Sequence, residues 1–111
     1  SGNTITTTST GAGTAFGVRI LNGASGSVTN NTITATNTST GIAIAAQVAG
    51  GGASATVSGN TLSGTGTPGR TVDLVGPVSV SGTGNVAASG TCTTSGAITG
   101  SIGFTNGTTC P

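Results

Sequence analysis

A short phrase built on asparagine recurs four times in this chain. It reads Ser1-Gly2-Asn3-Thr4-Ile5, Asn30-Asn31-Thr32-Ile33, Ser58-Gly59-Asn60-Thr61-Leu62 and, in a weaker form, Gly84-Asn85-Val86. Successive asparagines lie 28, 29 and 25 residues apart. A repeat period between about 20 and 50 residues is typical of solenoids, in which each unit stacks on the one before it. The repeat therefore predicts an architecture, and it does so without indicating any chemistry.

Each repeat also contains two further apolar segments. One alternates with a period of two residues, over residues 16–20, 41–44 and 71–74, and the other precedes the asparagine and places Val28, Val57 and Val80 at matching positions. Alternation of this kind is typical of a strand with one buried face. Gly, Thr and Ser are poor helix formers, and apolar residues at 3.6-residue spacing are missing. We therefore expect three short strands per repeat and no helix.

Stacked repeats would place like residues on like residues about 4.8 Å apart. We expect asparagine side chains to form an amide ladder at a tight turn, each bonding to the next and to turn backbone, through Asn3, Asn31 and Asn60. We also expect three inward apolar columns, made by Ile5, Ile33 and Leu62, by Val18, Ile42 and Val72, and by Ile20, Ile44 and Leu74.

The three-strand repeat, with its Asn-Thr-Ile/Leu phrases and stacked Val, Ile and Leu, resembles the right-handed parallel β-helix of the pectin-lyase-like families. The resemblance covers nearly the whole chain and implies an all-β solenoid of about four coils in one domain. The coils would lie near 1–27, 28–56, 57–79 and 80–111, the last being an irregular cap. This fold hosts lyases, hydrolases, phage tailspikes and secreted adhesins, so the resemblance implies a fold without selecting a function.

The fourth repeat departs from the pattern. Two more residues separate Val80 from Asn85 than separate Val57 from Asn60, and its inward strand is either 97–98 or 102–104. The two cysteines, Cys92 and Cys110, both lie in the last twenty residues. We expect a disulfide that caps the solenoid end and indicates an oxidising, extracytoplasmic setting, the alternative being two buried free thiols.

Charge is almost absent, since the chain has two basic and one acidic side chain in 111 residues. Without clustered Lys or Arg we expect no nucleic-acid partner, and without a long apolar run we expect no membrane insertion. A disordered Gly/Ser/Thr linker is the alternative for such a composition, but disorder does not require apolar residues in register. Ser1 lies inside a repeat phrase and no signal peptide is present, so we expect a cut piece or mature product of a longer protein.

The same composition argues against catalysis. Glycoside hydrolysis commonly requires two carboxylates, and a lyase would need carboxylates to hold Ca²⁺, whereas Asp73 is the one acidic side chain and His, Glu and Tyr do not occur. We therefore expect no catalytic residues, no metal site and no cofactor. We expect Arg19 and Asp73 to occupy outward positions two coils apart, with Ala43 between them, as a solvated pair.

Threonines flank the inward Ile or Leu of the strand that follows each asparagine. Stacked, they would form two outward columns of hydroxyls and methyls, about 4.8 Å apart along the axis and about 7 Å across the strand, from Thr4, Thr32 and Thr61 and from Thr6, Thr34 and Ser63. This face resembles the Thr-x-Thr face of β-solenoid ice-binding proteins. Thr is also simply a good, soluble strand residue.

Three functions follow from these features. The first is a non-catalytic structural or adhesive β-helix module of a secreted or surface-exposed bacterial protein, or of an extracellular fibre. The second is a carbohydrate-binding or receptor-binding part of a phage tailspike, and the third is ice binding. The partners expected are further copies of the chain, as a fibre or a trimer, or a surface polysaccharide. The expected location is extracellular, at the cell surface or on a virion.

Overall fold

The chain folds into three parallel β-sheets, and a computed structural model describes residues 1–107 and 109–111. No helix occurs among the described residues. The first sheet contains β1 (Thr4–Ser9), β4 (Thr32–Asn37), β7 (Thr61–Thr65) and β10 (Val86–Ser89). The second contains β2 (Ala15–Leu21), β5 (Ala43–Ala49), β8 (Gly69–Val75) and β11 (Thr91–Ser95). The third contains β3 (Ser25–Thr29), β6 (Ala53–Ser58), β9 (Val78–Ser81) and β12 (Ile98–Gly100).

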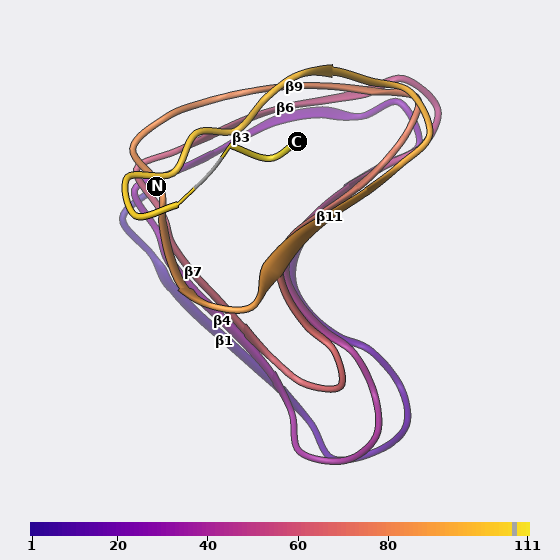
Figure 1. Ribbon diagram of the computed structural model, residues 1–111, viewed down its shortest axis with the longest axis vertical. Coiled ribbons are helices and arrows are strands. Elements are labelled where there is room, and N and C mark those ends of the chain that lie inside the picture. Colours follow the sequence, from indigo (N-terminus) through magenta and orange to yellow (C-terminus); the bar gives the residue numbers. More distant parts are fainter. Residues whose placement is uncertain (108) are drawn as a thin grey trace.

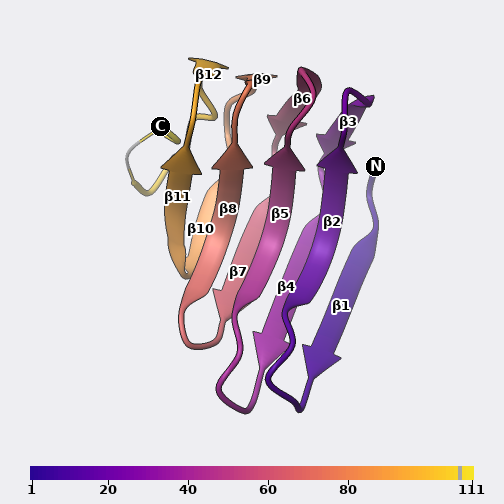
Figure 2. The same ribbon diagram turned by 90° about the vertical axis from the view of Figure 1, so that its right-hand side faces the viewer.

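Successive strands along the chain belong to different sheets, so the chain winds around an axis and returns to each sheet one rung further on. Figure 1 views the coils along that axis, and Figure 2 shows the strands stacked side by side. Each sheet has four rungs, and the whole makes a β-solenoid of about three turns. The predicted all-β parallel solenoid with three strands per coil is confirmed. The predicted coil boundaries fall inside β3, β6 and β9, because a periodic chain has no unique starting point.

The first sheet has the register that the asparagine phrases predict. Ile5 pairs with Ile33, and Ile33 pairs with Leu62. Ile33 and Leu62 are both fully buried in the core that runs along the axis. Apolar residues at the same strand position therefore form one inward column, as expected for parallel in-register stacking.

The second sheet corrects two predicted columns. Val18 and Val72 pair with Ala46, in place of Ile42, and Ile20 and Leu74 pair with Val48, in place of Ile44. The cause is the bend between β4 and β5, which takes up residues 38–42 and leaves Ile42 outside the strand. The apolar pattern continues from residue 41 to residue 49, so alternation alone did not fix which residues of this segment pair.

The third sheet brings a smaller correction. Val28 pairs with Val57 as predicted, but Val80 pairs with Ala55, two residues before Val57, and Val78 pairs with Ala53. The two additional residues between Val80 and Asn85 produce this shift. Val57, Val78 and Val80 nevertheless all remain in the buried core.

The solenoid tapers along its axis. The connections from the first sheet to the second shorten from residues 10–14 and 38–42 to 66–68 and finally to Gly90 alone. Figure 1 shows the corresponding lobe with a similar reach in the first two coils and a shorter one in the third and fourth. The last coil is therefore the narrowest of the four.

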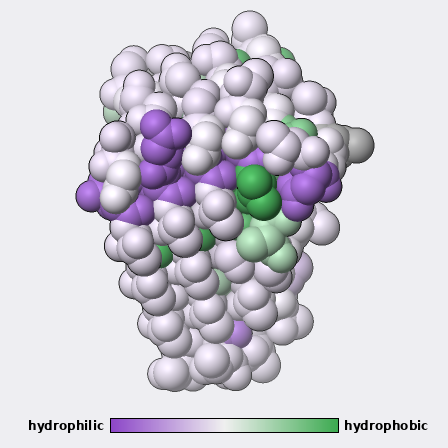
Figure 3. Space-filling model, turned by 90° about the vertical axis from the view of Figure 1, so that its left-hand side faces the viewer, coloured by the Kyte–Doolittle hydropathy of each residue, from purple (hydrophilic) through white to green (hydrophobic). Residues whose placement is uncertain are grey.

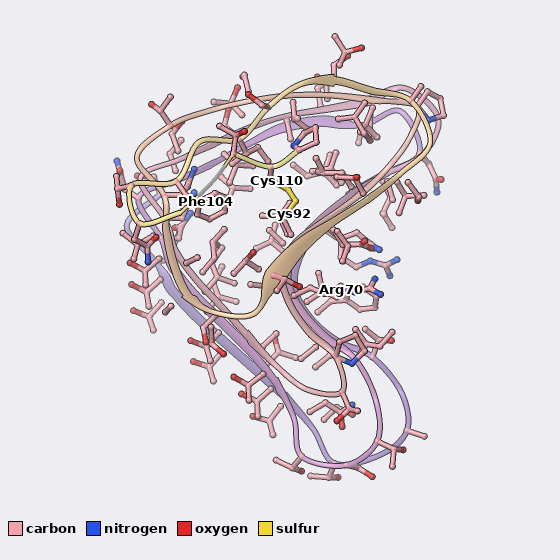
Figure 4. All side chains as sticks on the ribbon, viewed as in Figure 1. Arg70, Cys92, Phe104 and Cys110 are labelled. Carbon is pink, nitrogen blue, oxygen red and sulfur yellow. A yellow bond between two sulfur atoms is a disulfide. The ribbon has the colours of Figure 1, made fainter. Side chains whose placement is uncertain are left out.

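A cap covers part of the C-terminal end. Ile98 pairs with Val78 as part of β12, so residues 97–98 supply the third-sheet strand of the last coil. The other candidate segment, residues 102–104, lies beyond it, where Phe104 bridges to Asn85 and Ile102 bridges to Cys110. Ile102 is fully buried. The predicted Cys92–Cys110 disulfide is confirmed and joins β11 to this cap, as Figure 4 shows.

Candidate functional site

The asparagine phrases form a continuous ladder, which is exposed at Asn3 and buried from Asn31 onward. Both the backbone N–H and the Nδ2 of Asn3 donate to Oδ1 of Asn31, at 3.0 and 3.2 Å. Asn31 donates in the same way to Asn60, at 2.9 and 3.3 Å. Asn60 in turn donates to Asn85, at 3.1 and 3.0 Å. Asn60 and Asn85 are 1% and 0% exposed. The ladder thus extends into the degenerate fourth repeat, one rung beyond the three asparagines predicted.

Local backbone geometry explains why the phrase begins as it does. The residue before each ladder asparagine has a positive φ, which is 68° at Gly2, 54° at Asn30, 66° at Gly59 and 72° at Gly84. Gly adopts this conformation at no steric cost, and Asn tolerates it better than most other residues. The turn therefore selects Gly or Asn before the ladder, and the ladder side chains hold successive turns together.

The outward side of the first sheet carries hydroxyl groups in register. Figure 3 views this face, which is mostly pale because Thr and Ser are neither strongly hydrophilic nor strongly apolar. Two columns are those predicted, Thr4–Thr32–Thr61 and Thr6–Thr34–Ser63. A third column, Thr8–Thr36–Thr65, lies beside them. The sequence already contained the signal for this column, since the alternation continues to the end of each strand. The face is therefore one column wider than predicted.

A polar strip crosses the second sheet and contains all three charged side chains of the chain. Gln47, in place of the predicted Ala43, lies between Arg19 and Asp73 in the strand register. Nε of Arg19 donates to Oε1 of Gln47 at 2.9 Å, and Nε2 of Gln47 donates to Oδ2 of Asp73 at 2.8 Å. The Arg19 guanidinium also lies over the Phe16 ring, 3.9 Å from its centroid. Arg19 and Asp73 were predicted to be a solvated pair, but the Gln47 side chain connects them by one hydrogen bond to each.

Asp73 is the centre of this strip. Its Oδ1 accepts hydrogen bonds from Oγ1 of Thr93 at 2.6 Å and from Nη1 of Arg70 at 3.3 Å, the latter being an ion pair. Asp73 is 6% exposed. Figure 4 shows Arg70 on the side where the second sheet bends inward. Three donors hold the carboxylate in place, which suits it to fixing β5, β8 and β11 together.

A cavity of about 500 Å³ opens at the C-terminal end of the coil, where the cap leaves the narrow lobe uncovered. Its walls come from β8, β10 and β11 on one side and from the cap on the other, and they include Thr71, Ala87, Cys92, Thr94, Phe104 and Pro111. Sequence reasoning missed this cavity, because it depends on how the last residues fold back over the coil. A second hollow of about 610 Å³ lies on the third sheet and is lined mainly by Ser, Thr and Ala.

The residues that the structure describes contain no group of three or more His, Cys, Asp or Glu side chains that could hold a metal ion. Within the same residues there is no helix long and apolar enough to cross a membrane. Comparisons of the chain with models of protein families, with curated proteins and with solved structures found no match. The arguments about function therefore rest on the chain's own residues.

Proposed function

We propose that the chain is a non-catalytic structural and adhesive module of a secreted or surface-exposed protein or an extracellular fibre. The observation that carries the proposal is the asparagine ladder, which links all four rungs by side-chain hydrogen bonds. An amide both donates and accepts, so each asparagine satisfies its neighbours and stiffens the stack. A stiffened stack whose first sheet presents uncharged hydroxyl groups is suited to spacing and surface contact.

Two further observations support the proposal. The single carboxylate side chain, Asp73, is engaged by three donors, so it is poorly suited to act as an acid or base. The two cysteines are bonded to each other, and disulfides persist mainly in oxidising compartments. The resemblance to the pectin-lyase-like families concerns the fold, and the chemistry of those enzymes is not part of this proposal.

The test is co-sedimentation of the purified chain with insoluble polysaccharides such as cellulose, chitin and a mixed-linkage glucan, combined with an assay for new reducing ends. We expect retention on at least one polysaccharide and no increase in reducing ends during prolonged incubation. An increase in reducing ends abolished by heat denaturation of the protein would contradict the non-catalytic role. Light scattering on the same sample distinguishes a fibre module, which forms monomers or end-to-end polymers, from a tailspike part, which forms a stable trimer.

Ice binding is a second candidate, and the three Thr/Ser columns of the first sheet favour it. Their strict register gives hydroxyl and methyl groups at a spacing of about 4.8 Å along the axis and about 7 Å across the strand. Thermal hysteresis and inhibition of ice recrystallisation test this directly. If ice is the ligand, Thr34→Tyr, at the centre of the face, should abolish most of the hysteresis, whereas Thr56→Tyr on the third sheet should leave it unchanged. The absence of hysteresis in the unmodified chain would remove this candidate.

A further inference from the structure

The cavity at the C-terminal end has an aromatic ring in its wall. The chain has two phenylalanines and no Trp or Tyr. Phe16 lies under the Arg19 guanidinium on the second sheet, whereas Phe104 lines the cavity. At about 500 Å³ the cavity falls within the range of ordinary ligand pockets, about 300–1,000 Å³.

The side chains that line the cavity bear on the charge of a suitable ligand. They belong to Thr, Gly, Ala, Cys, Phe and Pro, and none of these side chains is charged. The three charged side chains of the protein are instead bound together in the strip on the second sheet. A charged ligand would lose hydration in the cavity without gaining an opposite charge, so these walls favour a neutral ligand.

The same walls define the ligand's polarity. Thr71, Thr91 and Thr94 line the cavity with residues whose hydroxyls can donate or accept, and the Thr109 hydroxyl, which donates to the Pro111 carbonyl, can still accept. Phe104 and Ala87 provide apolar contact. A pyranose sugar has this combination of surfaces, since its axial C–H face is apolar and its rim carries hydroxyls. An aromatic ring with a few well-placed polar groups is the usual lining of a small-molecule site.

The cavity is held in shape from both sides. Phe104 is fixed by its backbone bridge to Asn85. The cap is tied to β10 through Asn106, which accepts from the backbone N–H of Ala87 at 2.9 Å and donates to its carbonyl at 2.8 Å. The Cys92–Cys110 disulfide joins the β11 wall to the cap wall. A pocket fixed in this way loses little conformational freedom on binding.

We propose that this end cavity is a binding site for a neutral saccharide unit, with Phe104 as the ring on which the sugar stacks. The inference deepens the adhesive part of the proposed function and rests on it. It also places that adhesion at the capped end of the solenoid, away from the hydroxyl face of the first sheet.

The two phenylalanines provide an internal control. The full chain labelled with 4-fluorophenylalanine has two ¹⁹F resonances, which Phe16→Leu and Phe104→Leu assign. Cellohexaose and maltohexaose serve as neutral probes, and tri-galacturonate serves as a charged probe, each titrated to about 10 mM. We expect at least one neutral probe to shift the Phe104 resonance in a saturable manner, with the Phe16 resonance unchanged. By calorimetry, Phe104→Leu should weaken that binding at least about tenfold, and Phe16→Leu by less than about twofold.

Three results would overturn the site. They are a Phe104 resonance that responds to no neutral probe, a response at Phe16 alone, and tighter binding of the galacturonate than of both neutral probes. None of these results would affect retention of the chain on insoluble polysaccharide, since that retention can come from another face. Failure of the cavity is thus distinguishable from failure of the adhesive role. If Phe104→Leu does not fold, the titration of the labelled parent chain decides the question alone, with assignment from Phe16→Leu.

Discussion

The first and second sheets have the same number of strands, but the residues in their outward columns are arranged differently. Over the first three rungs of the first sheet the outward columns repeat nearly the same residue, as in Thr8, Thr36 and Thr65. On the second sheet one outward column changes at every rung, from Arg19 to Gln47 to Asp73 to Thr93. A hydroxyl can donate to or accept from its own kind, whereas like charges about 4.8 Å apart repel. A solenoid can therefore repeat neutral residues freely, but it must vary charged ones.

The polar strip shows how that variation works. Gln47 accepts from Arg19 and donates to Asp73, so the amide connects opposite charges that lie two rungs apart. The asparagine ladder uses the same property of the amide with identical partners. The difference between the sheets thus arises from the chemistry of the side chains, since the backbone stacking is the same in both.

The largest change in the free energy of unfolding is expected from substitutions on the inward side of a first-sheet strand, compared with its outward side. Ile33 is fully buried, while its neighbour Thr34 lies in an outward column. Ile33→Asp buries a carboxylate without a partner and should cost more than about 4 kcal/mol, enough to unfold the chain. Thr34→Asp should cost less than about 1 kcal/mol. Urea denaturation measures both, and equal tolerance would mean that the register is shifted by one residue.

Reduction of the disulfide should have the next largest effect. Cys92 and Cys110 are 18 residues apart, and closing such a loop is worth about 3 kcal/mol in the chain-entropy model. Because the bond joins β11 to the cap, reduction should release the C-terminal coil first and leave the first three rungs ordered. Hydrogen exchange with and without reductant measures this. Simultaneous loss of protection in β1 and β11 would show that the thin solenoid melts as one unit.

A smaller difference in stability is expected between substitutions in the polar strip and in the hydroxyl columns. Gln47→Met keeps the size of the side chain but removes one donor to Asp73 and the acceptor for Arg19, and should cost about 1–2 kcal/mol. The matched change on the first sheet, Thr34→Val, should cost less than about 0.5 kcal/mol, since Val is at least as good a strand residue. Equal costs would mean that the polar strip holds the strands of its sheet together no better than the hydroxyl columns do.

How far the sequence predicted the structure also differs between the sheets. The first sheet was predictable because each strand follows an Asn turn that fixes its starting point, so Ile5, Ile33 and Leu62 could be aligned directly. No such marker precedes β5. Its run of small and apolar residues allows several registers, and the bend at 38–42 decides among them. Gln47 was consequently overlooked as the partner of both Arg19 and Asp73.

The end cavity could not be predicted for a different reason. Cys92 and Cys110 indicated a capped end, and the disulfide is present. The path of residues 101–107 over the coil, however, depends on non-repeating contacts such as those of Asn106 with Ala87. A periodic pattern predicts repeating pairs, and it contains no information about a segment that leaves the repeat.

The central claim is that one amide ladder runs unbroken through all four rungs and holds successive coils together. Hydrogen exchange of the asparagine side-chain NH₂ groups, followed by NMR, tests it most directly. We expect the carboxamides of Asn60 and Asn85 to exchange as slowly as the backbone amides of β7, while that of the exposed Asn30 exchanges rapidly. Rapid exchange at Asn60 and Asn85, comparable to that at Asn30, would contradict the ladder and the structural role inferred from it.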